Sequence, residues 1–394
     1  MEFIVKQSVL LRELSLVQGV VERKNTVPIL ANILMSATGE TVSLMATDLE
    51  VSMRSTLTAA VQNEGSLSVS GRMLHEIVRS LPDSDIQLKS DDDNWATITC
   101  ERSHFRLMGL SGEQFPALPK PGSGAKVVFG IQPLRQMIQK VVFAVANDDG
   151  RYALNGALLI VAKGTISLVA SDGHRLAYVS RPLASAGDQA ELRVVVPHKA
   201  LMELARIGEE IGGEVLICRE DNQIFFETGR ALMSSRLLEG QFPSYEKVLP
   251  KGNDKIVELP RGAFGDALKR VALLSSERNR AVKVSVGKGK VEISAKNPEV
   301  GEARETLAAG YNGADVEIGF NARYILDFLG AVETDVVCLE LKDEATQGLL
   351  KGKEAARDGA AKGEKSGKGD KTSRTEAKAA AAEDYQYVVM PMRI

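Results

Sequence analysis

The segment VASDGHRLAYVSRP places a carboxylate, a glycine, an imidazole and a guanidinium in succession, at Asp172, Gly173, His174 and Arg175, between two strand-like apolar runs. A carboxylate and an imidazole this close could act as an acid–base pair in proton transfer. The chain, however, contains no nucleophile motif of the GxSxG type. Two other interpretations stay open: Asp172 caps a turn beside ordinary polar surface residues, or the segment is a loop that binds a peptide or another ligand.

Neither a metal site nor a phosphate-binding loop is indicated by the sequence. Cys100, Cys218 and Cys338 lie more than a hundred positions apart and form no CxxC pair, which argues against zinc and disulfides. The segment SVGKGKVE lacks the GxxxxGK[ST] spacing and joins two strand-like runs, so it is interpreted as a turn. We therefore expect no metal and no cofactor.

The composition is typical of a globular chain, with 394 residues, 44% hydrophobic and 26% charged, and a formal net charge of −3. No run approaches the roughly 18 apolar residues that can span a bilayer. The N-terminal MEFIVKQSVL is too short for a signal peptide. We expect a cytoplasmic protein with reduced thiols and no membrane partner.

The elements that position the Asp172 segment belong to a unit that occurs three times. Each copy has an apolar stripe at helical spacing, two strand-like runs joined by a short turn, and a second amphipathic stretch. The stripes are Leu10, Leu14, Val17 and Val21; Leu134, Met137, Ile138 and Val141; and Phe264, Ala267, Leu268 and Val271. The second helices lie in SGRMLHEIVRSLP, VPHKALMELARIG and FNARYILDFLGAV. We predict an α+β fold of three similar domains, each with two helices packed on antiparallel strands.

Proline-containing links separate the copies. GEQFPALP closes the first copy and EGQFPSYEKVLP the second, with Phe115 and Phe242 at corresponding places. We place the three domains at residues 1–124, 125–251 and 252–394, each boundary just after such a link.

A tract of low complexity interrupts the third copy. Residues 351–384 contain nine basic and seven acidic residues and no aromatic residue, so the tract cannot bury a core and is expected to be disordered. The first two copies have tight turns at this place, in WATITCERSHFRLMGL and QIFFETGRALMSSRLL. The tract is therefore predicted to be an expanded hairpin loop, and the rest of the chain has a net charge of −5.

Basic side chains recur on the predicted helices, among them Arg72, Lys140, Lys199 and Arg206. They could form a solvated helix face, or they could face nucleic-acid phosphates. A net-acidic body argues against tight binding of nucleic acid through charge alone.

Several motifs together closely resemble one family, the β subunits of bacterial DNA polymerase III, which are sliding clamps. They are PILANIL, ATDLE, RYALNG, SDGHRLAYVS, EGQFPSYEKVLP, EIGFNARYILDFL and the terminal YVVMPMRI. The resemblance implies a ring-shaped, head-to-tail homodimer of six similar domains, with helices lining the hole and sheets outside. It also implies a tether without catalytic activity that encircles duplex DNA and holds the replicative polymerase on it. The implied partners are the clamp loader and other polymerases and repair proteins with clamp-binding motifs.

The resemblance assigns three groups of residues. A hydrophobic cleft for partner peptides would be lined by Leu154, Ser171, Gly173, His174, Arg175, Leu176, Pro243, Lys247, Val248, Val388, Val389, Met390, Pro391, Met392 and Arg393. The DNA-facing residues would be Lys24, Arg72, Tyr152, Lys199 and Arg206, and the dimer contact would include Leu107, Leu273 and Leu274. Two residues depart from the family pattern. Lys247 stands where the family usually has arginine, and Met73 stands where it usually has a basic residue.

Two functions of other classes compete with this interpretation. A hydrolase using Asp172 and His174 would need a nucleophile or a metal ion. A repeat-based DNA-binding regulator would hold linear DNA tightly and with a steep salt dependence, whereas a clamp slips off free ends.

Overall fold

The structure is a computed structural model, and it describes residues 1–21, 27–122, 124, 126–146, 150, 152–183, 191–276, 280–353 and 383–393. Predicted DNA-facing Lys24 and residues 354–382 of the inserted tract lie outside the described residues. The chain divides into two compact units whose boundaries fall within the second sequence repeat. Unit 1 contains Met1–Gln136 and Val196–Leu237, and unit 2 contains Met137–Ala184 and Leu238–Ile394.

All six predicted helices are present, two in each sequence repeat. They are α1 (Gln7–Gln18), α2 (Gly71–Ser80), α3 (Ile131–Val141), α4 (His198–Glu210), α5 (Arg261–Ala272) and α6 (Ala322–Ala331). Their apolar stripes are buried, as the 3.6-residue spacing predicts; Leu10, Leu14 and Val17 of α1, for example, are fully covered. Among the described residues, none of the helices is long and apolar enough to cross a membrane.

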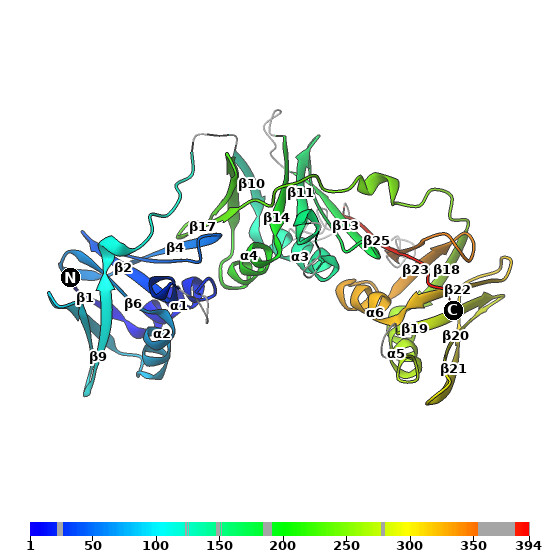
Figure 1. The fold of residues 1–394 in the computed structure, drawn as a ribbon, viewed down its shortest axis with the longest axis horizontal. Coiled ribbons are helices and arrows are strands. Elements are labelled where there is room, and N and C mark those ends of the chain that lie inside the picture. Colours follow the sequence, from blue (N-terminus) through cyan, green and yellow to red (C-terminus); the bar gives the residue numbers. More distant parts are fainter. Residues whose placement is uncertain are drawn as a thin grey trace, which may run out of the picture. The chain divides into compact units, whose positions relative to one another are not determined.

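Unit 1 is built on one antiparallel sheet. In spatial order its strands are β10 (Lys126–Gly130), β15 (Glu214–Glu220), β16 (Gln223–Glu227), β17 (Ala231–Arg236), β4 (Val51–Thr58), β3 (Thr41–Thr47), β2 (Asn32–Thr38), β6 (Gly65–Ser70), β9 (Ser103–Ser111), β8 (Trp95–Cys100), β7 (Asp85–Ser90), β1 (Glu2–Lys6) and β5 (Ala60–Asn63). Helix α1 packs on β3 and β4, and α2 packs on β2 and β6 (Figure 1). Both helices therefore cover strands of the first repeat.

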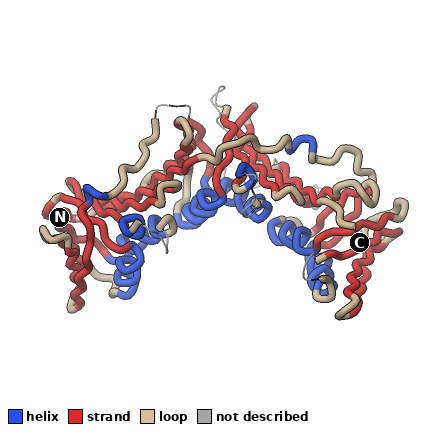
Figure 2. The backbone as a smooth tube through the Cα atoms, viewed as in Figure 1, coloured by secondary structure: helices blue, strands red, loops and turns tan. Residues whose placement is uncertain are grey.

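Unit 2 contains two sheets. The larger has the order β14 (Leu192–Pro197), β11 (Gly156–Ala162), β12 (Thr165–Ser171), β13 (Arg175–Pro182), β25 (Asp384–Val389), β24 (Gly348–Lys353), β23 (Val336–Leu341) and β18 (Lys255–Pro260). The smaller has the order β21 (Gly301–Ala308), β20 (Lys290–Asn297), β19 (Ala281–Gly287) and β22 (Val316–Asn321). Helix α5 packs on β20 and β21, and α6 on β22 and β25; Figure 2 shows these helices beside the strands that they cover.

The sheets continue across the boundaries between sequence repeats, which the sequence did not predict. Strand β17 of the second repeat pairs with β4 of the first, with Ser235 opposite Val51. Strand β13 of the second repeat pairs with β25 of the third, with Arg175 opposite Val389. Each boundary is therefore closed by backbone hydrogen bonds, and the compact units differ from the repeats for this reason.

The predicted hairpin at the inserted tract is confirmed for its flanks, but its boundaries were too wide. Strands β24 and β25 pair antiparallel, with Leu349 opposite Val388. Lys351 and Lys353 continue β24, where they form ion pairs with Glu340 of β23 and Glu258 of β18. At the other flank, Glu383 lies next to β25 and pairs with Lys140 and Arg181. Composition alone predicted that Lys351, Lys353 and Glu383 are disordered, but ion pairs with other elements stabilise these residues at the two flanks of the tract.

Candidate functional site

The loop from Asp172 to Arg175 is a turn closed by the Asp172 carboxylate. Asp172 Oδ1 accepts the backbone N–H groups of His174 and Arg175 at 2.9 and 3.0 Å. Gly173 has φ +86°, in the left-handed region that favours glycine. Ser171 Oγ accepts the Gly173 N–H at 3.1 Å and donates to the Arg175 carbonyl at 2.8 Å. The prediction that Asp172 caps a turn is confirmed.

Arg175 is not the ordinary surface residue that one interpretation expected, because its side chain is only 9% exposed. Nε donates to Asp172 Oδ2 at 3.0 Å, Nη1 to Asp327 Oδ2 at 2.5 Å, and Nη2 to the Phe143 carbonyl at 2.6 Å. The guanidinium also lies 5.5 Å from the Phe143 ring centre and 4.4 Å from that of Tyr324. We call these five residues the Arg175 cluster; within it, both Asp172 oxygens are bound by groups other than the His174 imidazole.

The other face of β13 carries an apolar cluster. Leu154, Leu176 and Val388 are buried in it together with Phe242, and Val248 packs against it half-buried. Because side chains alternate along a strand, Leu176 and Val388 point to one face of the sheet, and Arg175 and Val389 point to the other. The structure therefore divides the candidate cleft residues between two faces.

The remaining candidate residues lie around this strand pair. Gly173, His174, Pro243 and Lys247 are exposed, and Ser171 is half-buried. The chain end follows β25: the Met390 N–H donates to the His174 carbonyl at 2.9 Å, and the Met392 N–H to the Gly319 carbonyl at 2.8 Å. Pro391 is half-buried and Arg393 is exposed. Backbone hydrogen bonds thus hold the apolar chain end beside the loop.

Aromatic packing supports the strand on the side of the Arg175 cluster. Tyr387 of β25 stacks on Phe328 of α6 with ring centres 5.2 Å apart, and its hydroxyl donates to the Tyr324 carbonyl at 2.9 Å. Burial raises the pKa of the Tyr387 hydroxyl, against the lowering effect of nearby Arg175. The hydroxyl is therefore a neutral hydrogen-bond donor that ties β25 to α6.

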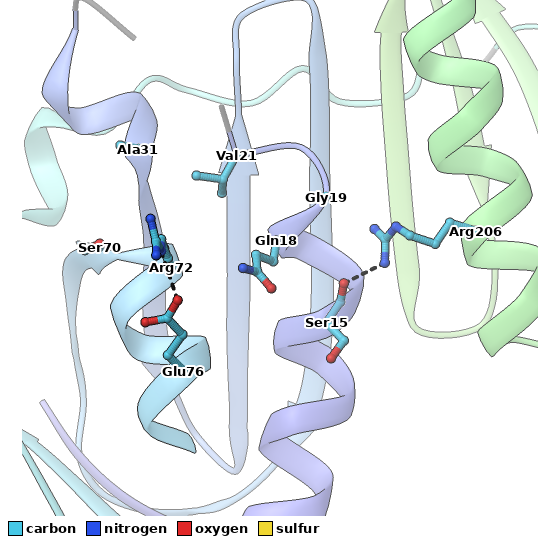
Figure 3. Close-up of a pocket in the computed structure, with 9 residues that line it drawn as sticks. All are labelled: Ser15, Gln18, Gly19, Val21, Ala31, Ser70, Arg72, Glu76 and Arg206. Carbon is cyan, nitrogen blue, oxygen red and sulfur yellow. Dashed lines mark hydrogen bonds and ion pairs between the residues drawn. The ribbon is translucent and has the colours of Figure 1, made fainter. Parts of the chain in front are cut away.

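A second candidate site lies in unit 1, between α1, α2 and α4. It is a depression of about 600 Å³, lined by Ser15, Gln18, Gly19, Val21, Ala31, Ser70, Arg72, Glu76 and Arg206 (Figure 3). Arg72 is exposed and pairs with Glu76 one helical turn later at 2.9 Å, and this hydrogen bond raises the pKa of Arg72. Two arginines that the sequence places 134 positions apart thus line one depression.

Arg206 reaches from α4 to the end of α1. Its Nη1 donates to the Ser15 carbonyl at 2.6 Å (Figure 3). Its Nη2 donates to the Leu16 carbonyl and to Glu203. A Cβ atom on Gly19 would overlap the Glu203 carboxylate and the Arg206 guanidinium, so glycine permits this approach. A cation at the carbonyl end of a helix is electrostatically favourable.

The other predicted DNA-facing residues are differently placed. Lys199 of α4 pairs with Asp48, whose side chain is 3% exposed. Of Tyr152 only the backbone is described, in a short 3₁₀ turn before β11. Lys140 does not face outward as the basic-helix hypothesis expected, because it is buried against Glu383. Within the described residues, no group of three or more His, Cys, Asp or Glu side chains is placed to hold a metal ion.

Comparison with known proteins decides the family. The chain matches the DNA polymerase III beta subunit over its N-terminal domain at residues 1–119, its central domain at 131–244 and its C-terminal domain at 246–358. The chain belongs to the DNA polymerase III β-subunit family.

Relatives and solved structures agree with this assignment. Proteins named Beta sliding clamp from Pseudomonas putida and Salmonella typhimurium are 38% and 33% identical, each over 100% of both chains. The sliding clamp of Pseudomonas aeruginosa bound to griselimycin superposes with a TM-score of 0.89 at 37% identity. The DNA polymerase sliding clamp of Caulobacter crescentus superposes with a TM-score of 0.86 at 33% identity. Both structural comparisons cover 100% of both chains.

The residues assigned to a contact between β subunits are apolar and partly open to solvent. Leu273 follows α5 and is 80% exposed, and Leu274 is half-buried. Leu107 is half-buried on β9, where β8 pairs with Ser103–Met108. The neighbouring Met108, which the sequence analysis did not name, is exposed on the same strand.

Sequence reasoning also missed Asp327 and Tyr324, the α6 members of the Arg175 cluster. A signal was present, since Asp327 occupies the same place in α6 as Glu76 in α2 and Glu203 in α4. Each of these carboxylates pairs with an arginine, which is Arg72, Arg206 or Arg175. Only the fold shows that the partner of Asp327 comes from another repeat.

Proposed function

We propose that the chain works as a sliding clamp: a head-to-tail homodimer that encircles duplex DNA and tethers the replicative polymerase, while partner peptides bind over the apolar cluster of Leu154, Leu176, Val248 and Val388. The observation that carries the proposal is the chain end, which is held beside this cluster by β25 and by the Met390–His174 hydrogen bond. Apolar side chains that stay partly open to solvent beside a buried apolar cluster, as those of Met390 and Met392 do, are typical of a binding surface.

The depression of unit 1 supports weak, mobile contacts with DNA. Arg72 is exposed, but Glu76 and Glu203 partly neutralise the two arginines of the depression. A ring retains DNA by topology, so it needs few phosphate contacts, and tight ones would slow sliding. The net charge of −3 fits the same requirement. We infer that Arg72 and Arg206 face the DNA, together with Lys24, Tyr152 and Lys199.

Retention on circular DNA tests the clamp function. The protein is loaded on a nicked plasmid by a bacterial clamp loader, isolated by gel filtration, and then treated with a restriction enzyme that cuts the plasmid once. We expect retention before cutting and release after it. Protein that stays on the linear product and dissociates only with salt would support the DNA-binding regulator instead.

Truncation of the chain end tests the peptide site. Removing Met390 through Ile394 deletes two methionines, and each buried large apolar side chain contributes about 1.5–3 kcal/mol. A fluorescent peptide with a glutamine and a Leu–Phe end should therefore bind at least about 100-fold more weakly, as measured by anisotropy. Sedimentation should show dimers in both proteins, and equal affinity would contradict the proposed site.

The dimer contact would join the Leu107 region of one copy to Leu273 and Leu274 of the other. Strand β21 is at the edge of its sheet, where its free backbone groups can pair with another chain. Replacing Leu273 with Ala and Leu274 with Lys should give monomers in sedimentation, because an unpaired cation in an apolar contact costs several kcal/mol. An unchanged dimer would contradict this assignment.

The remaining parts of the proposal concern roles and setting. We infer three clamp domains at residues 1–124, 125–251 and 252–394, with no catalytic activity of their own. The clamp loader and other polymerases and repair proteins would share the peptide site, in the cytoplasm where the chromosome is copied. Half-buried Met390 and Met392 fit a surface that accepts several peptides, since methionine side chains adapt their shape.

A further inference from the structure

The proposed peptide site lies on one face of the β13–β25 strand pair. The opposite face carries the buried guanidinium of Arg175. Arg175 and Leu176 are consecutive on β13, so they point to opposite faces of the sheet. Leu176 joins the apolar cluster with Leu154 and Val388. Arg175 joins Asp327 and Tyr324 of α6. The residue next to the peptide surface thus faces away from it.

All three nitrogens of the Arg175 guanidinium form hydrogen bonds within the protein. Its three nitrogens donate to Asp172, Asp327 and the Phe143 carbonyl, and rings lie within cation–π distance. With a side chain 9% exposed, Arg175 offers little surface to any ligand. The partners come from three segments of the second and third repeats: the turn before β13, the 3₁₀ turn Val142–Ala144 and α6.

We propose that Arg175 is a positioning residue of the partner site and that it works through Asp327 of α6. The inference rests on the proposed peptide site. The pair joins the start of β13 in the second repeat to α6 in the third, and α6 also supports β25 through Tyr387. It thereby fixes the loop, whose His174 carbonyl accepts the Met390 N–H, in register with the chain end.

Loss of the pair is expected to disturb the loop before it disturbs the apolar cluster. Without Asp327, the Arg175 guanidinium keeps Asp172 but loses its charged partner on α6. The loop and α6 can then move apart, and the Met390–His174 hydrogen bond is the first contact between loop and chain end to weaken. The peptide surface would lose its preformed shape, which lowers affinity without removing a contact.

The test uses variants of the full-length protein that each remove one charge of the pair and keep a polar side chain. D327N and R175Q should each bind the fluorescent Gln/Leu–Phe peptide at least about tenfold more weakly than the wild type. The double variant R175Q/D327N should have the same peptide affinity as the single variant that binds the peptide less tightly, because the two residues act as one pair. R323Q is the matched control: it removes an exposed charge from the same helix and should bind like the wild type.

Hydrogen exchange of the Met390 amide, measured by NMR without peptide, gives a second readout. It should be faster in D327N and R175Q than in the wild type and R323Q, while circular dichroism confirms that all four proteins are folded. R175K should recover part of both readouts, since it keeps the charge but not the fork geometry.

Each contrary outcome has a definite meaning. Wild-type affinity in D327N with weak binding in R175Q would overturn the proposal, because Arg175 would then contact the peptide itself. Wild-type affinity in both variants, or an equal loss in R323Q, would overturn it as well. If the wild type binds no peptide, the proposed function fails, and Met390 exchange still decides whether the pair positions the loop.

Discussion

The loops Asp48–Val51 and Asp172–Arg175 lie at the two repeat boundaries. They share a backbone turn, but they form ion pairs of opposite polarity with the next repeat. In the first repeat, Asp48 Oδ1 accepts the N–H groups of Glu50 and Val51 at 2.9 and 2.6 Å. Asp172 does the same for His174 and Arg175 in the second repeat. The residue after each aspartate has a positive φ, +77° for Leu49 and +86° for Gly173. The first and second repeats therefore share this aspartate-capped turn, although the other side chains in it differ.

The difference is in the charge that each loop presents to the next repeat. At the first boundary the loop offers Asp48 to Lys199 of α4. At the second boundary the loop offers Arg175 to Asp327 of α6. Both helices are the second helices of their repeats, so the same two elements are joined at both boundaries, although Lys199 is the second residue of α4 and Asp327 the sixth of α6. The polarity of the ion pair is reversed. Repetition of the fold determines where a contact forms, and the local sequence determines which charges form it.

The two ion pairs also differ in their geometry. Lys199 is a single ammonium, and its side chain is 33% exposed. Arg175 has a planar fork that bonds two carboxylates and a carbonyl at once. The loop of the second boundary, where the proposed partner site lies, therefore forms more side-chain bonds with its surroundings through Arg175 than the first loop forms with Lys199.

Removing the cation at the second boundary should have the largest effect. R175M leaves the Asp172 and Asp327 carboxylates without their shared partner, and breaking a buried pair costs about 3–5 kcal/mol. Urea denaturation followed by circular dichroism measures the loss in free energy of unfolding. The triple variant R175M/D172N/D327N removes the unpaired charges and should recover most of it; no recovery would show that packing, not charge, explains the loss.

Removing the cation at the first boundary should cost less. K199M takes the cation from one carboxylate, Asp48, whereas R175M takes it from two, so we expect a loss of about 1–2 kcal/mol in the same urea titration. D48N/K199M keeps the turn, removes both charges and should be close to the wild type. A loss in K199M as large as that in R175M would erase the contrast between the boundaries.

Exchanging the residue with positive φ should have the smallest effect. Leu49 is 60% exposed, so L49G relieves an unfavourable backbone conformation and should raise the free energy of unfolding by about 0.5–1 kcal/mol. G173A should lower it by about 1 kcal/mol, because alanine disfavours the left-handed region. Changes of the same sign in both variants, measured by thermal unfolding, would show that the two turns are not equivalent.

The local architecture could be predicted from the sequence, but the contacts across repeats could not. Helices with stripes such as Leu10, Leu14 and Val17 follow from periodicity, and strand pairs follow from short turns between alternating runs. The pairing of β17 with β4 joins segments about 180 residues apart, and no periodicity names such a partner. Each boundary therefore had to be seen in the structure.

The burial of charged residues could not be predicted either, because the sequence does not show which charged side chains are paired inside the fold. Lys140 and Arg175 have the composition of surface residues, yet each is buried because carboxylates from other segments surround it. The turn at Asp172 was predicted correctly, because an aspartate before glycine caps a turn through local hydrogen bonds. The candidate residues beside it were named by family resemblance, and their division between two faces follows from strand alternation.

The strand pairings across repeat boundaries have a consequence for a repeat taken out of the chain. A fragment of residues 125–251 would lack β4 and β25, so β17 and β13 would each expose a row of unpaired backbone donors and acceptors. Such edges pair with any matching strand, including those of identical fragments. The excised repeat would therefore be a self-associating building block rather than a stable monomer, with its copies competing for the places that the covalent neighbours occupy in the intact protein.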